Sequence, residues 1–125
     1  MSIARVVSMR SKDPSTKVGA VLVSEDNRIV GTGYNGFVKG SAETEEMWER
    51  PEKYKWVIHA ELNCILHSVK SHKNTTIYTT MFPCVECSKA IVAAGIIQVV
   101  YCDDAYKNPT SDRLLEMGGI KVVKL

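Results

Sequence analysis

The chain has 125 residues, 45% of them hydrophobic, and a formal net charge of +2 at pH 7. This length predicts a single domain over residues 1–125 with enough apolar side chains for a core. The balanced charge, without a dense block of Lys and Arg, argues against a nucleic-acid polymer as partner. No apolar run is long enough to span a bilayer and the N-terminus has no signal-peptide pattern, so we expect a cytoplasmic protein without membrane contacts.

The chain begins with an apolar pattern that predicts a short amphipathic helix. Ile3, Val6 and Val7 recur at helical spacing, and the helix is expected to end near Asp13-Pro14, because a residue before proline is pushed out of the helical region. Apolar runs then predict a hairpin of strands at 18–23 and 28–34. Residues 35–55 are predicted as a long loop with a helical turn near 44–48.

The second half of the chain alternates between helical and strand patterns. A helix is expected from about residue 59, with Leu62, Ile65, Leu66 and Val69 facing the core. Later elements are predicted as strand 75–79, a helix ending at residue 95, strand 96–102, a helix containing 113–117, and strand 120–124. This alternation favours parallel strands joined by right-handed crossovers. We therefore expect an α/β fold, a three-layer α/β/α sandwich with a five-stranded mixed sheet.

The most informative motif is divided between the starts of two predicted helices. Glu61 follows His59 by two residues, and Pro83 precedes Cys84 and Cys87. One imidazole and two thiolates form a ligand set for a tetrahedral zinc ion with a fourth position open for water. H-x-E followed by P-C-x-x-C is the signature of zinc-dependent nucleobase deaminases, in which the Glu is a general acid/base. The motif predicts hydrolytic replacement of an exocyclic amine by a carbonyl oxygen.

A closed zinc site that only stabilises the fold is the alternative interpretation, and it needs a fourth protein ligand. His67 lies two helical turns after His59, and His72 lies in a polar loop, so we expect both as surface or packing residues. Cys64 lies in an apolar helical pattern and Cys102 ends an apolar strand. Both are expected as small buried residues without a disulfide.

The chain resembles the deoxycytidylate (dCMP) deaminases of the cytidine deaminase-like superfamily. The resemblance covers nearly the whole chain and rests on four motifs in family order: Arg10–Ala20, Gly33–Phe37, His59–Asn63 and Pro83–Cys87. It implies deamination of dCMP to dUMP with release of ammonia. It also implies one zinc ion held by His59, Cys84 and Cys87, with Glu61 as the catalytic residue and the backbone near Ala60 at the pyrimidine edge.

The resemblance implies further contacts to the substrate. Asn35 would contact the sugar, and Tyr106 would pack near the base, although a surface tyrosine on a polar turn is the alternative. The 5′-phosphate is expected at Ser15, Thr16 and Lys17, where hydroxyls, backbone donors and a cation precede the first strand. A solvated polar loop is the alternative for that segment.

Regulation is also implied by the resemblance, because such enzymes are often homohexamers that dCTP activates and dTTP inhibits. Gly33, Tyr34, Gly36 and Phe37, with the loop that follows, would then form an effector site at a subunit interface, with Mg²⁺ accompanying the bound nucleotide. Residues 38–57 contain no Cys or His, so the second, structural zinc ion of some relatives is not expected.

Competing functions remain open at this level. The same metal chemistry serves deaminases of free cytidine, of guanine and of tRNA adenosine. A tRNA enzyme is expected to have a basic surface, which a net charge of +2 does not provide. A non-catalytic zinc binding module is the remaining alternative, and Glu61 argues against it because a silent site has no need of that carboxylate.

Overall fold

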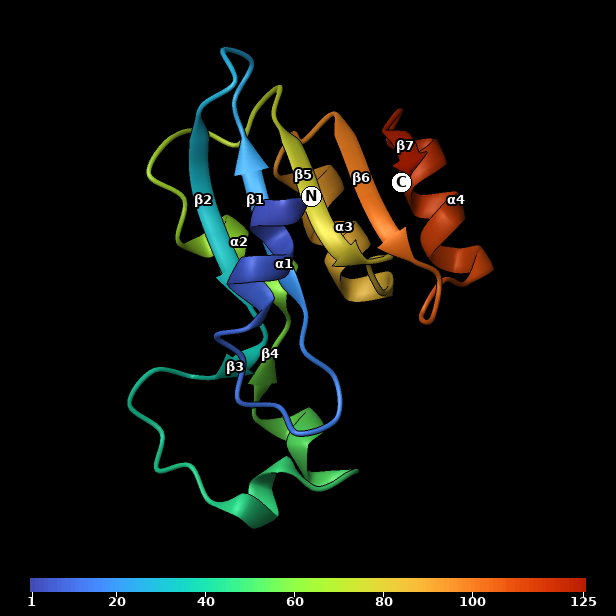
Figure 1. The fold of residues 1–125 in the computed structure, drawn as a ribbon. Helices are drawn as coiled ribbons and strands as arrows, with labels where there is room; N and C mark the ends of the chain where they lie inside the picture. Colours follow the sequence, from blue (N-terminus) through green and yellow to red (C-terminus); the bar gives the residue numbers. More distant parts are fainter.

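A computed structural model describes residues 1–125, and its centre is one five-stranded sheet (Figure 1). The α-helices are α1 (Ser2–Ser8), α2 (Ala60–Leu66), α3 (Val85–Ala93) and α4 (Pro109–Met117), with 3-10 helices η1 (Glu45–Trp48) and η2 (Glu52–Lys55). The strands are β1 (Gly19–Val23), β2 (Ile29–Tyr34), β3 (Gly36–Phe37), β4 (Val57–Ile58), β5 (Thr76–Met81), β6 (Gln98–Asp103) and β7 (Lys121–Lys124). No helix combines the length and the apolar character that crossing a membrane requires.

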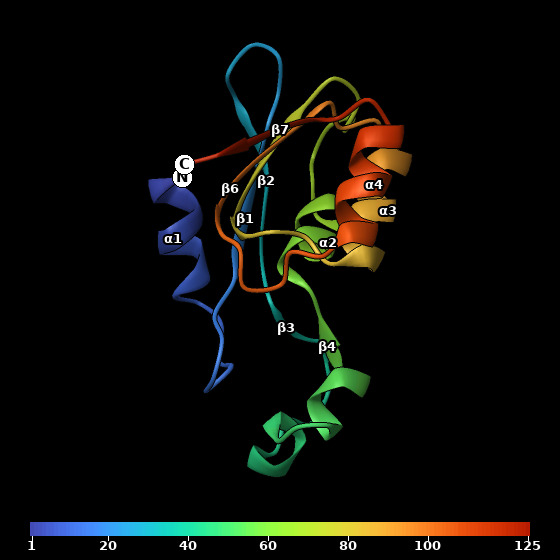
Figure 2. The same ribbon diagram turned by 90° about the vertical axis from the view of Figure 1, so that its right-hand side faces the viewer.

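The sheet has the strand order β2-β1-β5-β6-β7. β1 is antiparallel to both β2 and β5, whereas β5, β6 and β7 are parallel. A short turn joins β1 to β2, while each parallel step requires a crossover, which α3 and α4 supply. Helix α1 lies on one face of the sheet, and α2, α3 and α4 lie on the other (Figure 2). The predicted three-layer α/β/α sandwich with a mixed five-stranded sheet is confirmed.

The hydrophobic core is built around the central strands. Leu22, Ile77 and Val99 come from β1, β5 and β6 and have no exposed surface. Ile91 from α3 and Leu115 from α4 belong to the same cluster and are equally buried. Each such side chain contributes about 1.5–3 kcal/mol by leaving water. The core therefore fixes α3 against the strands on which the candidate site depends.

The apolar face predicted for α2 is wrong in three of its four residues. Ile65 is buried, but Leu62 and Leu66 are exposed, and Val69 lies beyond the helix with 82% of its surface exposed. The buried face carries smaller residues because α2 lies directly on β2. A Cβ atom at Gly33 would lie 2.3 Å from the backbone nitrogen of Cys64.

Helix α1 departs from its prediction for the same reason. Ile3 and Val6 are 52% and 65% exposed, and only Ala4 is buried. A Cβ atom at Gly19 would lie 2.0 Å from the carbonyl oxygen of Ala4. The close approach of helix and strand thus admits a small residue and turns the larger ones outward. The helix also ends earlier than predicted, at Ser8.

The segment between β2 and α2 contains more structure than the predicted loop. Strands β3 and β4 pair antiparallel and bring Gly36 opposite Ile58 and Phe37 opposite Val57. The ring of Phe37 stacks on Trp48, with centroids 4.2 Å apart. The predicted helical turn near residues 44–48 is η1, and the whole segment projects beyond one end of the sheet (Figure 1).

The two cysteines outside the zinc motif differ in their surroundings. Cys64 is fully buried as predicted, and all four cysteines are free thiols. Cys102 is only half-buried, which corrects the prediction of a buried residue. Its Sγ accepts a hydrogen bond from Nη2 of Arg5 at 2.9 Å, so α1 approaches the end of β6 at this point.

Candidate active site

The three predicted metal ligands lie together at the starts of two neighbouring helices. His59 is the N-cap of α2, Cys84 is the N-cap of α3, and Cys87 lies in the first turn of α3. His59 Nδ1 lies 3.2 Å from Cys84 Sγ and 3.5 Å from Cys87 Sγ. The three potential ligand atoms all lie within 4.8 Å of one another. The two halves of the motif therefore meet in space.

The donor set fits a zinc ion with three protein ligands. One imidazole nitrogen and two thiol sulfurs are typical zinc ligands, and no further His, Cys, Asp or Glu belongs to the cluster. His67 and His72 are engaged elsewhere, with the carbonyl oxygens of Asn63 and Ile65 respectively. A fourth protein ligand, which the closed structural site needs, is therefore absent from the cluster.

The pKa values of the two thiols are shifted in opposite directions. The side chain of Cys87 hydrogen-bonds Cys84 and lowers the pKa of the Cys84 thiol to about 4, against the effect of burial and with support from His59. The pKa of the Cys87 thiol is raised, first by this interaction with Cys84 and then by burial. Hydrogen bonding to Cys84 also raises the pKa of His59, against the effect of burial. The cluster thus contains a thiolate available for a cation.

Glu61 lies in the first turn of α2, on the side of the helix that faces the protein interior. Its side chain is 4% exposed, and burial raises the pKa of its carboxyl group above the ordinary value. Thr79 from β5 is fully buried, and its hydroxyl donates to Oε1 of Glu61 at 2.8 Å. The carboxyl group is therefore held in one place while it still lines a cavity.

A cavity of about 430 Å³ lies in front of this cluster and is lined by 16 residues. Seven of the residues singled out from the sequence line it: Thr16, Asn35, His59, Ala60, Glu61, Cys84 and Tyr106. Such a volume accommodates a small ligand. The cavity thus joins the zinc motif to the predicted sugar and base contacts.

The other predicted residues lie outside the cavity lining. Ser15 and Lys17 are exposed, and neither lines the cavity. Gly33 is buried against α2, and the ring of Tyr34 lies 5.9 Å from Cζ of Arg10. Gly36 and Phe37, which form β3, are half-buried.

Three charged residues of the cavity were not identified from the sequence. Asp13 and Lys53 form a buried ion pair at 2.9 Å, with side chains 2% and 6% exposed. Arg50 lines the cavity, is exposed, and forms no ion pair. Asp13 and Lys53 are 40 residues apart in the sequence, so no local spacing pattern links them. An X-Asp-Pro turn and a Lys in a charged loop are too common to indicate a site.

Asp13 organises the polar end of the cavity. Its Oδ1 accepts from the backbone N–H groups of Ser15 and Thr16 and from the Ser15 hydroxyl. Burial raises the pKa of Asp13, but the hydrogen bond from Lys53 and those from Ser15 and Thr16 outweigh this effect, so the pKa lies below the ordinary value. Asp13 is therefore an ionised carboxylate in the folded protein at neutral pH.

Comparison with known proteins agrees with this geometry. Residues 1–103 match the family model described as "Cytidine and deoxycytidylate deaminase zinc-binding region". A deoxycytidylate deaminase of Homo sapiens is 40% identical over 131 residues, which cover 96% of this chain and 74% of that protein. A deoxycytidylate deaminase of Enterobacteria phage T4 is 34% identical over 166 residues, covering 98% of this chain and 86% of that protein.

A similar structure supports the same assignment. The dCMP deaminase of the cyanophage S-TIM5, solved in complex with dCMP and dUMP, superposes with a TM-score of 0.85 and is 30% identical. The match covers 99% of this chain and 92% of that one. With the family model matched over residues 1–103 and the ligand cluster assembled at two helix starts, the chain belongs to the cytidine and deoxycytidylate deaminase family.

Proposed function

We propose that this protein deaminates dCMP hydrolytically, so that dCMP and water give dUMP and ammonia. The observation that carries the proposal is the position of Glu61, which lines the cavity beside the cluster of His59, Cys84 and Cys87. Burying a carboxyl group costs free energy, and its place beside the ligand cluster and the cavity gives it a chemical role that offsets this cost. The relatives named as deoxycytidylate deaminases support dCMP as the substrate.

His59, Cys84 and Cys87 would hold one zinc ion. When bound, zinc supplies Lewis acidity and a water of lowered pKa at neutral pH. The protein side of this site is prepared by the N-terminus of α3, where the backbone N–H of Cys87 points to Cys84 Sγ at 3.5 Å. This N–H group and the partial positive charge of the helix start both stabilise a thiolate.

Glu61 would move the protons of the reaction. Water adds to C4 of the cytosine ring while the carboxylate of Glu61 takes a proton and delivers it to the ring nitrogen N3. The same carboxyl group then moves the remaining proton of the new C4 hydroxyl to the exocyclic nitrogen, the C4–N bond breaks as the C4 carbonyl forms, and ammonia leaves. Thr79 keeps one carboxyl oxygen at a fixed position through its 2.8 Å hydrogen bond. The backbone near Ala60 would contact the edge of the base.

Substrate recognition would use the remaining cavity residues. Asn35 would contact the deoxyribose, and Tyr106, which is 47% exposed at the cavity, would pack against the base. For the 5′-phosphate we propose Thr16 of the predicted Ser15–Lys17 segment together with Arg50. Arg50 is the lining residue whose positive charge has no partner in the chain, and a guanidinium suits phosphate oxygens.

Replacing Glu61 by Gln tests the chemistry. The amide keeps the size of the side chain but cannot cycle a proton, so ammonia release from dCMP should fall about 10²–10⁴-fold. Zinc content, measured on the same samples, should stay equal to that of the wild type. A panel of dCMP, CMP, deoxycytidine and dCTP identifies the substrate. Wild-type protein that releases ammonia from none of these would contradict the proposal and favour a zinc binding module.

We further propose that dCTP activates and dTTP inhibits the enzyme within a homohexamer, with Mg²⁺ accompanying the nucleotide. Gly33, Tyr34, Gly36 and Phe37, with the loop that follows, would contribute to the effector site. Tyr34 is 36% exposed and the segment after β3 projects beyond the sheet, which supports a role between subunits. Rates measured over a range of dCMP concentrations, with no effector, dCTP or dTTP, test this. Identical curves in the three conditions would exclude regulation.

A further inference from the structure

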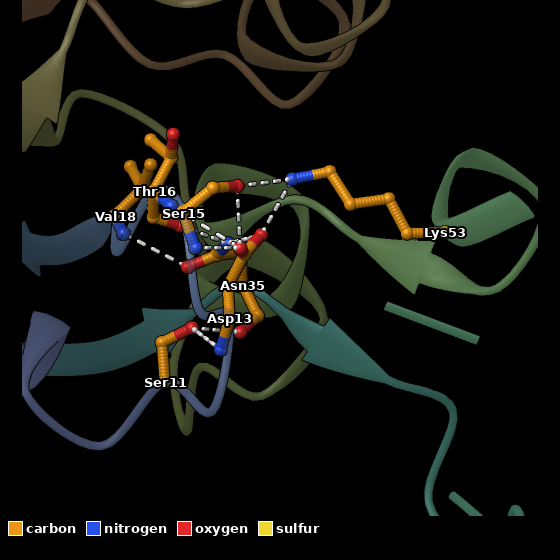
Figure 3. Close-up of polar contacts among 7 residues, drawn as sticks. All are labelled: Ser11, Asp13, Ser15, Thr16, Val18, Asn35 and Lys53. Atoms are coloured by element: carbon orange, nitrogen blue, oxygen red, sulfur yellow. Dashed lines mark hydrogen bonds and ion pairs between the residues drawn. The ribbon is translucent and has the colours of Figure 1, made fainter. Parts of the chain in front are cut away.

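The polar end of the cavity contains a connected set of buried and partly buried hydrogen bonds (Figure 3). Lys53 reaches across from η2 and donates to Oδ2 of Asp13 at 2.9 Å and to Oγ of Ser15 at 3.1 Å. Oδ2 of Asp13 also accepts from Nδ2 of Asn35 at 3.3 Å. Lys53, Asp13 and Asn35 are each at most 6% exposed. Lys53 thus connects to Asn35 through a single carboxylate oxygen.

The partners of Asn35 determine which way its side-chain amide is turned. Nδ2 donates to the carbonyl oxygen of Thr16 at 2.9 Å and to Oδ2 of Asp13, which uses both of its protons. Oδ1 accepts from the backbone N–H of Val18 at 2.8 Å. The reverse orientation would place two acceptors against Oδ1 and a donor against Nδ2. The amide therefore has one orientation.

This orientation leaves Asn35 with one unused hydrogen-bonding position, the second lone pair of Oδ1. An acceptor of this kind recognises a hydroxyl group that donates. In dCMP the phosphate esterifies the 5′ oxygen and the 2′ position carries no hydroxyl, so the 3′-hydroxyl is the group available on the sugar. Both Asn35 and Val18 line the cavity.

We propose that Lys53 is a positioning residue for the sugar site: through Asp13, it holds Asn35 as an acceptor for the 3′-hydroxyl of the substrate. The positive charge of Lys53 is neutralised by Asp13. Lys53 is therefore used for this internal ion pair and not for the phosphate. Arg50, which forms no ion pair within the chain, is available for the phosphate. The inference deepens the proposed function and rests on it.

The test compares dCMP with 2′,3′-dideoxycytidine monophosphate, which lacks only the 3′-hydroxyl. The measured quantity is the ratio of kcat/KM for the two substrates with the same enzyme preparation, so a loss of folded protein cancels. The wild type should prefer dCMP about 10–100-fold, as for one buried hydrogen bond. Asn35→Ala should bring the ratio near one. Lys53→Met should lower it at least about 5-fold, chiefly by loss of activity on dCMP.

Two further variants keep the test decisive. Lys53→Met leaves Asp13 buried without its cation, so if this variant does not fold, Ser15→Ala replaces it, because only one hydroxyl of the set is removed. Ser15→Ala should lower the ratio about 2–3-fold. Arg50→Met should leave the ratio at the wild-type value while it weakens the preference for dCMP over deoxycytidine.

The inference is wrong if Lys53→Met, or Ser15→Ala in its place, keeps the wild-type preference for the 3′-hydroxyl while activity falls equally on both substrates. It is also wrong if Lys53→Met loses only the preference for dCMP over deoxycytidine, because Lys53 would then contact the phosphate. Failure of the proposed function gives a different result, since the wild type itself would release no ammonia from dCMP.

Discussion

The two ends of the cavity are built in different ways. At the metal end, His59, Cys84 and Cys87 lie at the starts of α2 and α3, which the sheet places side by side. At the polar end, Asp13 comes from an irregular segment and Lys53 from the short 3-10 helix η2, and an ion pair joins them. The metal end is carried by helices packed on the sheet, whereas the polar end depends on hydrogen bonds made by its own side chains. We expect mutations at the first to remove chemistry, and mutations at the second to affect stability and binding.

The strongest test of this division is removal of a metal ligand. In Cys84→Ala, two protein ligands remain and zinc content should fall from about one per chain to near zero, with loss of deamination. Zinc analysis and an ammonia assay on the purified protein check this. Cys102→Ala is the matched control, because it removes a cysteine outside the cluster. Cys84→Ala protein with full zinc content would contradict the assignment.

The next largest effect is expected at the polar end. Asp13→Asn leaves Lys53 buried without its counter-charge and should lower the free energy of unfolding by about 3–5 kcal/mol. Asp26→Asn is the control, because the ion pair between Asp26 and Arg28 is exposed and such pairs contribute about 0–1 kcal/mol. Urea unfolding of the three proteins gives the comparison. Equal midpoints for the two variants would show that the buried pair does not hold this end together.

The same ion pair predicts a dependence of stability on pH. The pKa of Asp13 is lower in the folded protein than the ordinary value of about 3.9 in an unfolded chain. Its contribution is therefore complete above that value and disappears as the pH falls through the lower, folded pKa. The gap in unfolding free energy between wild type and Asp13→Asn should be constant from about pH 5 to 7 and narrow below about pH 4. A constant gap down to the lowest pH would contradict the pairing.

The smallest effect is expected at Gly33, where α2, which carries part of the metal end, packs on the sheet. In Gly33→Ala, the new methyl group would meet Cys64 N at 2.3 Å and Ala60 O at 2.4 Å, both of them backbone atoms of α2. The helix must shift, at a cost of about 1–3 kcal/mol, and Glu61 shifts with it. The midpoint temperature of thermal unfolding and kcat should both fall. Gly36→Ala is the control, because there a methyl group meets only Tyr34 at 3.7 Å.

The fold and the metal end could be predicted because their signals are local. Periods of about 2 and about 3.6 residues indicate strands and helices, and the spacing from Cys84 to Cys87 is itself close to one helical turn. The exposed Leu62 and Leu66 could not be predicted, because helical spacing does not reveal which apolar face packs. Gly33 is the residue that indicates the packed face: a glycine in the strand beneath a helix lets that helix pack closely through its small residues.

The polar end could not be predicted from the sequence, because no local rule joins its residues. Asp13 and Lys53 meet only when η2 folds back over the first loop. Strands β3 and β4, which bring η2 there, have two residues each, too few for an alternating pattern. The resemblance indicated Asn35 as a sugar contact, but only the three-dimensional arrangement reveals its hydrogen-bond partners.

The way Asp13 receives its donors has a consequence for engineering the substrate range. The chain from Ser11 to Val18 forms neither helix nor strand. The buried carboxylate of Asp13 holds its backbone in place by accepting hydrogen bonds from the N–H groups of Ser15 and Thr16. Pro14 and Lys17 are exposed. Substitutions at these two exposed positions should therefore change the free energy of unfolding little. A library that randomises Pro14 and Lys17 and spares Asp13 would therefore sample new charge and shape on the outer side of the segment whose Asp13 and Thr16 line the cavity, with most of its members still folded.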